Sequence, residues 1–190
     1  ASNVTIDTQK KIILTGAEPY NIVTSPDGKR VFVANSVQDT ISVIDTSNQS
    51  LIGAIDIRNS VCNDPDRNRH FQPRGLAVTL NNDRLYVTRF LSFTGGATPK
   101  QGTDDGKLGV VCRVNINTAS TQIADYVPTQ AIEIGSLDSG FKIPNNANIT
   151  KAYPNQMQSI VIRGDQAYLP NIASSPSGPL RFNVDTQAFV

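Results

Sequence analysis

The chain has 190 residues, with 17 basic and 16 acidic side chains and a formal net charge of +1. This near balance argues against a nucleic-acid-binding domain, which normally carries a strong basic excess. The sequence has no apolar run of the roughly 18 or more residues that a membrane-spanning helix needs, so no membrane span is expected.

Side-chain composition favours β-structure. Ile and Val together number 34 against 10 Leu, 16 Thr add further β-branched side chains, and 14 Asp stand against only 2 Glu. β-branched residues suit strands, Asp suits tight turns, and strong helix formers are scarce. We therefore expect an all-β fold. Charged residues are only 17% of the chain, below the roughly 25% usual in soluble domains. With abundant Asn, Thr and Ser, this favours an extracytoplasmic location, either periplasmic, cell-surface or secreted.

An internal repeat of four short strands organises the chain. Residues 1–16 contain what is expected to be the last two strands of one copy, at 3–7 and 11–14. The copy at 18–57 is the clearest. Its strands are predicted at 20–24, 30–34, 40–44 and 51–57, separated by turn sequences such as Ser25-Pro26-Asp27-Gly28, in which Pro presets φ and Gly accepts a positive φ.

Two later copies follow. For the copy at 72–127 the predicted strands are 75–79, 84–88, 109–115 and 121–126, and for the copy at 153–190 they are 159–163, 166–169 and 180–184. The third strand of each copy ends in a similar tripeptide. The four tripeptides are Ile6-Asp7-Thr8, Ile44-Asp45-Thr46, Ile116-Asn117-Thr118 and Val184-Asp185-Thr186. Serial copies of four antiparallel strands are typical of the blades of a β-propeller.

The second strand of each copy carries a family resemblance. The segments are Val31-Phe32-Val33-Ala34-Asn35, Leu85-Tyr86-Val87-Thr88-Arg89 and Ala167-Tyr168-Leu169-Pro170-Asn171. With the Pro-Asp-Gly turn and the Ile-Asp-Thr ending, they resemble the YVTN-repeat β-propeller family. The second segment departs from that pattern at Arg89, and the third copy has Arg163-Gly164-Asp165 in place of Pro-Asp-Gly. The resemblance implies a fold and leaves the function open, since propellers serve many functions.

The number of copies implies an incomplete ring. Propellers have about 4–8 blades, and the copies here amount to three or four. We expect a partial β-propeller of four-stranded antiparallel blades over residues 1–190, belonging to a ring of about seven, with the remainder supplied by further chain or by a second chain. Alternatively, the divergent loops hide further short strands, for instance at 130–134.

Long connections are expected on one face of these blades. They are the segments 58–72, 90–108, 128–153 and 172–179, whereas the turns on the opposite face are short. Long loops in compact domains are uncommon and often functional. This face is therefore expected to bind a ligand, a partner protein or a companion domain.

Five residues are candidate ligand contacts on that face: His70, Arg74, Arg89, Asn155 and Asn171. His70 is the only histidine, and it can transfer a proton, bind a ligand or simply lie in an interface loop. The Arg and Asn residues occupy repeated positions after the first Pro or at the end of the second strand. Arg74 and Arg89 can hold an anionic group; the alternative is that these Arg and Asn residues cap the blade edges and bind neighbouring carbonyls.

Two further sets of residues have defined chemistry. Asp64, Asp66 and Asn68 alternate as at the start of a calcium loop, but Arg69 occupies the place of the required Gly and no Glu follows at the twelfth position. Calcium is thus the only cofactor that this pattern suggests, and the alternative is that these three residues lie in a solvated turn. Cys62 and Cys112 are the only cysteines, and an oxidising compartment would let them pair as a disulfide.

The expected function is a binding scaffold without catalysis of its own. No Cys-x-x-Cys-His, Gly-x-Ser-x-Gly, P-loop or His-Glu-x-x-His motif occurs. The resemblance also allows two alternatives: the propeller part of a periplasmic or surface redox enzyme with a peroxidase-like haem domain, and a lactonase-type hydrolase.

Overall fold

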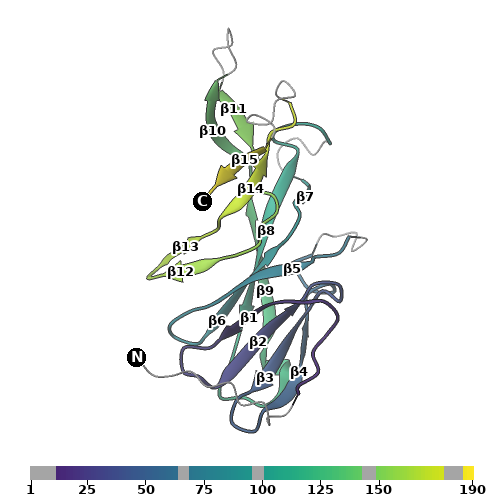
Figure 1. Ribbon diagram of the computed structural model, residues 1–190, viewed down its shortest axis with the longest axis vertical. Helices are drawn as coiled ribbons and strands as arrows, with labels where there is room; N and C mark the ends of the chain where they lie inside the picture. Colours follow the sequence, from purple (N-terminus) through teal and green to yellow (C-terminus); the bar gives the residue numbers. More distant parts are fainter. Residues whose placement is uncertain (1–11, 64–68, 96–100, 143–148, 178–185) are drawn as a thin grey trace.

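The structure is a computed structural model that describes residues 12–63, 69–95, 101–142, 149–177 and 186–190. Nearly all of its regular elements are antiparallel strands, as Figure 1 shows. The strands of the first part are β1 (Pro19–Thr24), β2 (Arg30–Asn35), β3 (Thr40–Asp45), β4 (Ser50–Asp56), β5 (Pro73–Val78), β6 (Arg84–Arg89), β7 (Phe93–Thr94) and β8 (Lys107–Asn115). After the short 3-10 helix η1 (Ile123–Asp125) come β9 (Val127–Ile134), β10 (Leu137–Lys142), β11 (Ile149–Ala152), β12 (Val161–Arg163), β13 (Gln166–Tyr168), β14 (Asn171–Ser174) and β15 (Thr186–Phe189). The predicted all-β class is confirmed.

The first sheet is a four-stranded antiparallel meander in the order β1-β2-β3-β4. All four strands predicted between residues 18 and 57 are present. The turn between β1 and β2 is closed by the amide of Gly28, which donates to the carbonyl of Ser25 (2.9 Å), and Gly28 has the positive φ of 72° that favours glycine there. Turn chemistry that is local in the sequence thus sets this register.

The second sheet repeats the first in its strand order and in its turns. It has the order β5-β6-β8, with β9 on the other side of β8 and the two-residue β7 beside the far end of β8. Its first turn matches that of the first sheet: the amide of Ser25 donates to the carbonyl of Arg30 (2.9 Å), and that of Thr79 donates to the carbonyl of Arg84 (3.0 Å). The hydrogen bonds therefore support the alignment of the two copies.

The predicted fourth strand of the second copy, at 121–126, is wrong. That segment forms η1 instead, and the fourth strand is β9, which pairs with β8 from Asn115↔Val127 to Gly109↔Ile134. The segment leaves the sheet because it contacts the first sheet, where the hydroxyl of Tyr126 accepts a hydrogen bond from Arg30 Nε (3.0 Å). The alternative of a hidden strand at 130–134 is confirmed as part of β9. As the outermost strand, β9 also tolerates Pro128, which has no N–H to donate.

The third copy differs from the prediction. Strands β12 and β13 form a hairpin near the predicted positions, whereas β14 pairs with β15 as a separate two-stranded sheet. The segment predicted to become the third strand, 180–184, lies outside the described residues, as do the strand predicted at 3–7 and residue 11 of the other predicted N-terminal strand, whose described residues 12–14 form no strand. Within the described part, the 128–153 connection is no continuous loop, because it holds nearly all of β9 and the paired strands β10 and β11.

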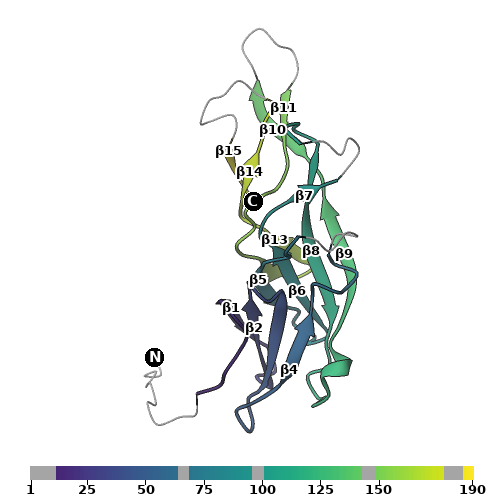
Figure 2. The ribbon, with the colours of Figure 1, turned by 90° about the vertical axis from the view of Figure 1, so that its right-hand side faces the viewer.

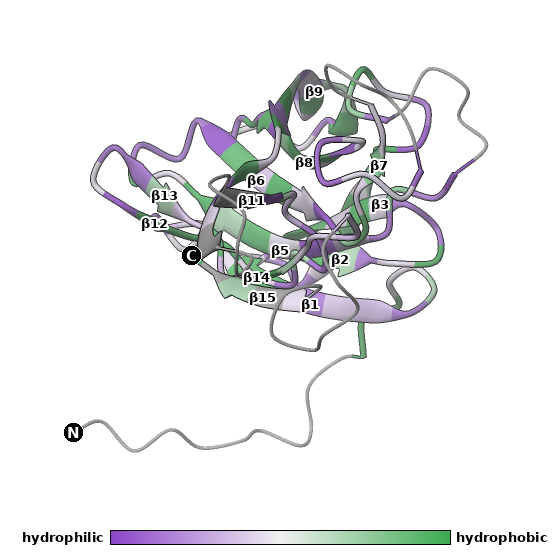
Figure 3. Cartoon of the chain, turned by 90° about the horizontal axis from the view of Figure 1, so that it is seen from above, coloured by the Kyte–Doolittle hydropathy of each residue, from purple (hydrophilic) through white to green (hydrophobic). Residues whose placement is uncertain are grey.

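Alternate side chains of each strand enter different layers of the core. Phe32 and Ala34 of β2, with Leu85 and Val87 of β6, belong to the core between the first and second sheets. Tyr86, between the two β6 residues, packs instead in a smaller core toward β12. This is the period of two expected of a strand with both faces covered. Figure 2 shows the first sheet below and beside the long strands β8 and β9, and Figure 3 shows hydrophobic and hydrophilic residues alternating along β6.

Candidate functional site

The connection that follows β4 is fastened to the second sheet by a disulfide. Cys62 of this connection is bonded to Cys112 of β8, with the two Cα atoms 5.3 Å apart, and both residues are buried. The predicted disulfide is confirmed. It fixes the middle of the connection over the core between the sheets.

Side chains fasten the same connection at its two ends. The amide nitrogen Nδ2 of Asn63 donates to the carbonyls of Arg58 (3.1 Å) and Arg69 (3.3 Å), so it bridges the start and the end of the segment. Arg89, at the end of β6, donates from Nη2 to the carbonyl of His70 (3.2 Å) and from Nη1 to Oδ1 of Asn63 (3.4 Å). Arg89 is almost fully buried, and its role in the described contacts is to hold this loop.

A buried carboxylate orients the only histidine. Oδ2 of Asp39, in the turn between β2 and β3, lies 2.9 Å from Nδ1 of His70, and Oδ1 of Asp39 accepts a hydrogen bond from the amide of Gln72 (2.8 Å). The Asp39 side chain is fully buried, whereas that of His70 is 48% exposed. Asp39 has a positive φ of 55°, which is uncommon outside glycine and is found at sites where the surroundings impose the conformation.

Arg58 completes the cluster. Its Nη1 lies 4.0 Å from Oδ2 of Asp39 and 3.5 Å from Nδ1 of His70, and its side chain is 40% exposed. One buried carboxylate therefore anchors two side chains that are each partly exposed to solvent. We call Asp39, Arg58 and His70 the Asp39 cluster.

The geometry fixes what His70 can do. An ionised carboxylate only accepts hydrogen bonds, so Nδ1 of His70 carries the proton that Oδ2 of Asp39 accepts. Nε2 is then the unprotonated nitrogen of a side chain that is 48% exposed, and it can take a proton or contact a ligand. Orientation of a histidine by a carboxylate on its other nitrogen is common at both metal and acid–base sites.

Sequence reasoning identified His70 and missed its two partners. Asp39 looks like an ordinary turn residue in the sequence, and 31 residues separate it from His70. Arg58 lies at the start of the connection, 12 residues before His70. The pairing of β3 with β4 brings Arg58 beside Asp39, since the amide of Ile57 donates to the Asp39 carbonyl (3.0 Å), and no local pattern signals that His70 joins them.

Arg74 lies between the two sheets rather than free in a channel. Its guanidinium carbon stacks 3.8 Å from the ring centroid of Tyr20 and 4.6 Å from that of Phe90, and Nη2 is 3.7 Å from Oε1 of Glu18. Such cation–π stacking is favourable when the pair is shielded from water. The described contacts of Arg74 thus link the beginning of β1 to the second sheet.

The two asparagine candidates make contacts within the fold. Asn155 Oδ1 accepts hydrogen bonds from the amide (3.0 Å) and the hydroxyl (3.3 Å) of Ser92, and its Nδ2 donates to Ser174 Oγ (3.3 Å). Asn171 donates from Nδ2 to the carbonyl of Leu169 (2.9 Å). They lie near each other, since the amide of Ile172 donates to the carbonyl of Asn155 (3.1 Å). Neither joins the Asp39 cluster in these contacts.

The predicted calcium ligands Asp64, Asp66 and Asn68 lie outside the described residues. Within the described ranges, no group of three His, Cys, Asp or Glu side chains is placed to hold a metal ion. The same ranges contain no helix long and apolar enough to cross a bilayer.

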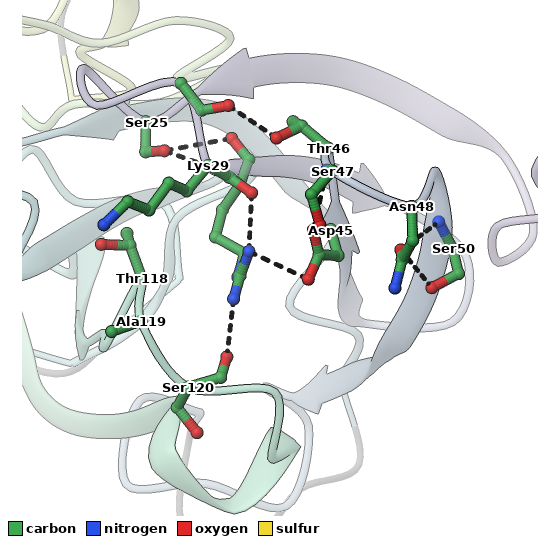
Figure 4. Close-up of polar contacts among 12 residues, drawn as sticks. Ser25, Lys29, Asp45, Thr46, Ser47, Asn48, Ser50, Thr118, Ala119 and Ser120 are labelled. Atoms are coloured by element: carbon green, nitrogen blue, oxygen red, sulfur yellow. Dashed lines mark hydrogen bonds and ion pairs between the residues drawn. The ribbon is translucent and has the colours of Figure 1, made fainter.

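The opposite face, with the short turns, holds a second polar cluster that joins the sheets. Buried Arg30 lies 3.3 Å from Oδ2 of Asp45 through Nη1 and donates from Nη2 to the carbonyl of Ser120 (3.0 Å) and from Nε to Tyr126. Figure 4 shows Ser120 approaching from the second sheet while Asp45 and Ser47 come from the first. These contacts are structural, because each nitrogen of the Arg30 guanidinium is occupied.

Two carboxyl groups of this face have lowered pKa values. The hydroxyl and the amide of Ser47 donate to Asp45 and, with the nearby Arg30, lower its pKa. Burial alone would raise the pKa of Asp27, but hydrogen bonds from Ser25, Lys29 and Thr118 outweigh it, and the net shift is downward. Both groups therefore favour the ionised form in the folded chain.

No protein-family model matches the chain, and no curated protein matches its sequence. Among solved structures, a functionally unknown protein from Desulfotomaculum acetoxidans DSM 771 is similar over 70% of this chain, at 23% identity and a TM-score of 0.48. Hydrazine synthase of Kuenenia stuttgartiensis is similar over 97%, at 13% identity and a TM-score of 0.34. This chain covers 33% of the former structure's chain and 65% of the latter's. At such TM-scores these likenesses say nothing of what the chain does.

Proposed function

We propose that the chain is part of an extracytoplasmic β-propeller and that its long-loop face binds a ligand or a partner protein without catalysing a reaction itself. The observation that carries this proposal is the fastened connection between β4 and β5. A disulfide, Asn63 and Arg89 hold it in place, and it presents half-exposed His70 above buried Asp39. Ordering a loop before binding lowers the entropy cost of binding.

An uncovered apolar face supports the propeller part of the proposal. On the side of the first sheet away from the second, Ile22 is 65% exposed, and Tyr20 at its edge is 45% exposed although Arg74 stacks on its ring. Together with Val31, Val33 and other residues they line a hollow of about 590 Å³. Apolar surface of this kind normally marks an interaction site. In the proposed ring another blade covers it, supplied by further chain or by a second chain.

The extracytoplasmic location rests on the disulfide. Structural disulfides persist in oxidising compartments and are rare in the reducing cytosol. The buried Cys62–Cys112 bond and the low content of charged residues agree with such a compartment.

Site-specific photo-crosslinking in the complete source protein tests the binding face. A crosslinking side chain at Val61, which is 63% exposed in the fastened connection, should form adducts. The matched control is Thr121, exposed beside the short turns. Adducts at Thr121 without adducts at Val61 would contradict the proposal. Lactone hydrolysis by the source protein would also contradict the proposal if it were lost in His70→Gln, because the chain would then take part in catalysis.

Thiol labelling tests the ring. Both cysteines of these 190 residues are in the disulfide, so within this segment an introduced cysteine is the only target of a maleimide. In the complete protein Ile22→Cys should be protected, whereas Leu80→Cys, at a turn position that is 76% exposed, should react rapidly. Equal labelling rates would show that no blade covers the first sheet.

A further inference from the structure

The guanidinium of Arg58 has unused hydrogen-bonding capacity. Its 4.0 Å separation from Asp39 is an ion pair without a hydrogen bond, and only its Nη1 has a described polar contact. No described residue accepts a hydrogen bond from its Nε or Nη2. An arginine has five N–H donors in a planar fork, and among the described residues one edge of the Arg58 fork has no acceptor.

The Asp39 carboxylate, which neutralises the charge of Arg58, already accepts hydrogen bonds at both oxygens. Oδ1 of Asp39 accepts the Gln72 amide and Oδ2 accepts the His70 ring, and the side chain is inaccessible to solvent. Asp39 therefore holds Arg58 and His70 close together without offering an oxygen to the outside. The acidic group nearest to Arg58 in the sequence, Asp56, accepts hydrogen bonds from Asn59 through both oxygens.

The backbone positions of both side chains are also linked. Asn63 donates to the carbonyl of Arg58 and to that of Arg69, the residue before His70. Arg89 holds the carbonyl of His70 itself. The backbone at both residues is thus fixed before binding, which lowers the entropy cost of ordering the site when a ligand binds.

We propose that Arg58 and His70 form a binding site for an oxyanion, the carboxylate or phosphate group of a ligand. A guanidinium fork matches the paired oxygens of both groups, and the exposed edge of an oriented imidazole lies beside it. Asp39 is the positioning residue of this site. The inference deepens the proposed function, because it assigns a ligand class to the long-loop face and rests on that face being the binding surface.

Because His70 is the only histidine, its imidazole gives one set of ring signals in an NMR spectrum and reports directly on the site. The 190-residue chain is titrated with sodium phosphate and with sodium acetate at fixed pH, with ionic strength held constant by sodium chloride. We expect a saturable shift of the ring signals with one of the two anions, which also identifies the preferred group. Arg58→Gln should weaken this binding by at least tenfold.

The control variant is Arg163→Gln, which removes an exposed arginine from the β12–β13 hairpin and should leave the titration unchanged. Shifts that stay linear for both anions, or equal affinities for Arg58→Gln and the parent chain, overturn the inference. Loss of affinity in both arginine variants also overturns it, because it shows that net charge alone attracts the anions. If Val61 still crosslinks to a ligand or partner in the source protein while no anion binds, the oxyanion site fails and the proposed function stands.

Discussion

Asp39 and His70 meet across 31 residues of chain, with Oδ2 of the carboxylate 2.9 Å from Nδ1 of the ring. The contact joins the β2–β3 turn of the first sheet to a loop that the second sheet holds through Cys112 and Arg89. The orientation of the only imidazole therefore depends on the packing of the two sheets.

Asp39→Asn should change the protonated nitrogen of His70. The Gln72 amide requires an acceptor, so the Asn carbonyl will face it and the NH2 group will face the ring. Nδ1 must then accept instead of donate, and the proton moves to Nε2. Nitrogen-15 NMR of the imidazole measures this directly. Arg58→Gln, which leaves the carboxylate in place, should keep the proton on Nδ1, and an unchanged spectrum in Asp39→Asn would show that the described pair does not form in solution.

Arg30 and Arg84 occupy equivalent positions in the two sheets but differ in burial. Arg30 is buried and bound to Tyr126 and Ser120, whereas the Arg84 side chain is 48% exposed and 3.8 Å from Asp83. Arg30→Ala should lower the free energy of unfolding by about 3 kcal/mol, because it leaves buried polar partners unpaired. Arg84→Ala should change it by about 0.5 kcal/mol or less. Urea denaturation of both variants makes the comparison, and similar losses would argue against a structural role for the Arg30 contacts.

Acid should weaken the face with the short turns. The folded-state pKa values of Asp27 and Asp45 lie below the ordinary value of 3.8, so below that pH the unfolded chain binds more protons than the folded one. The stabilisation is present above about pH 4 and is lost as the pH falls through the folded-state values. Urea midpoints measured against pH should fall less steeply in Asp27→Asn/Asp45→Asn. Asp165→Asn, at an exposed hairpin turn, is the control and should keep the parent slope.

Gly75 allows the third copy to approach the second sheet. A Cβ at Gly75 would lie 2.8 Å from the Ser159 backbone, which cannot move aside as a side chain can. Gly75→Ala should therefore cost about 1–3 kcal/mol of stability. Gly135→Ala is the matched control, because its Cβ would meet only Leu108 at 3.8 Å. Hydrogen exchange should show faster exchange at Met157, whose amide bonds the Phe90 carbonyl, in the first variant alone.

The disulfide should stabilise the chain through the loop it closes. Cys62 and Cys112 are 50 residues apart, for which chain entropy predicts about 4 kcal/mol. Cys62→Ala/Cys112→Ala should lower the free energy of unfolding by an amount approaching this value, as measured by urea denaturation. A loss no larger than that of an ordinary surface substitution would mean that the fastened connection is held by Asn63 and Arg89 alone.

The sequence was sufficient for features that depend on local chemistry. The first sheet was predictable because Pro-Asp-Gly and alternating β-branched residues set each turn and strand within a few positions of themselves. Segment 121–126 was misassigned because Tyr126 turns away from its own sheet to reach Arg30, 96 residues earlier. The pairing of β14 with β15 likewise depends on distant chain, and so does the presence of Asp39 beside His70. No short pattern contains such information.

The Asp39 cluster lies across a seam, with its carboxylate on one sheet and its imidazole tethered to the other. A rotation of one sheet against the other would therefore change the separation of the carboxylate and the imidazole. The NMR signal of the imidazole therefore depends on the angle between the two sheets. If assembly of the proposed ring changes that angle, the His70 ring resonance should shift, although the assembling surface lies elsewhere in the molecule.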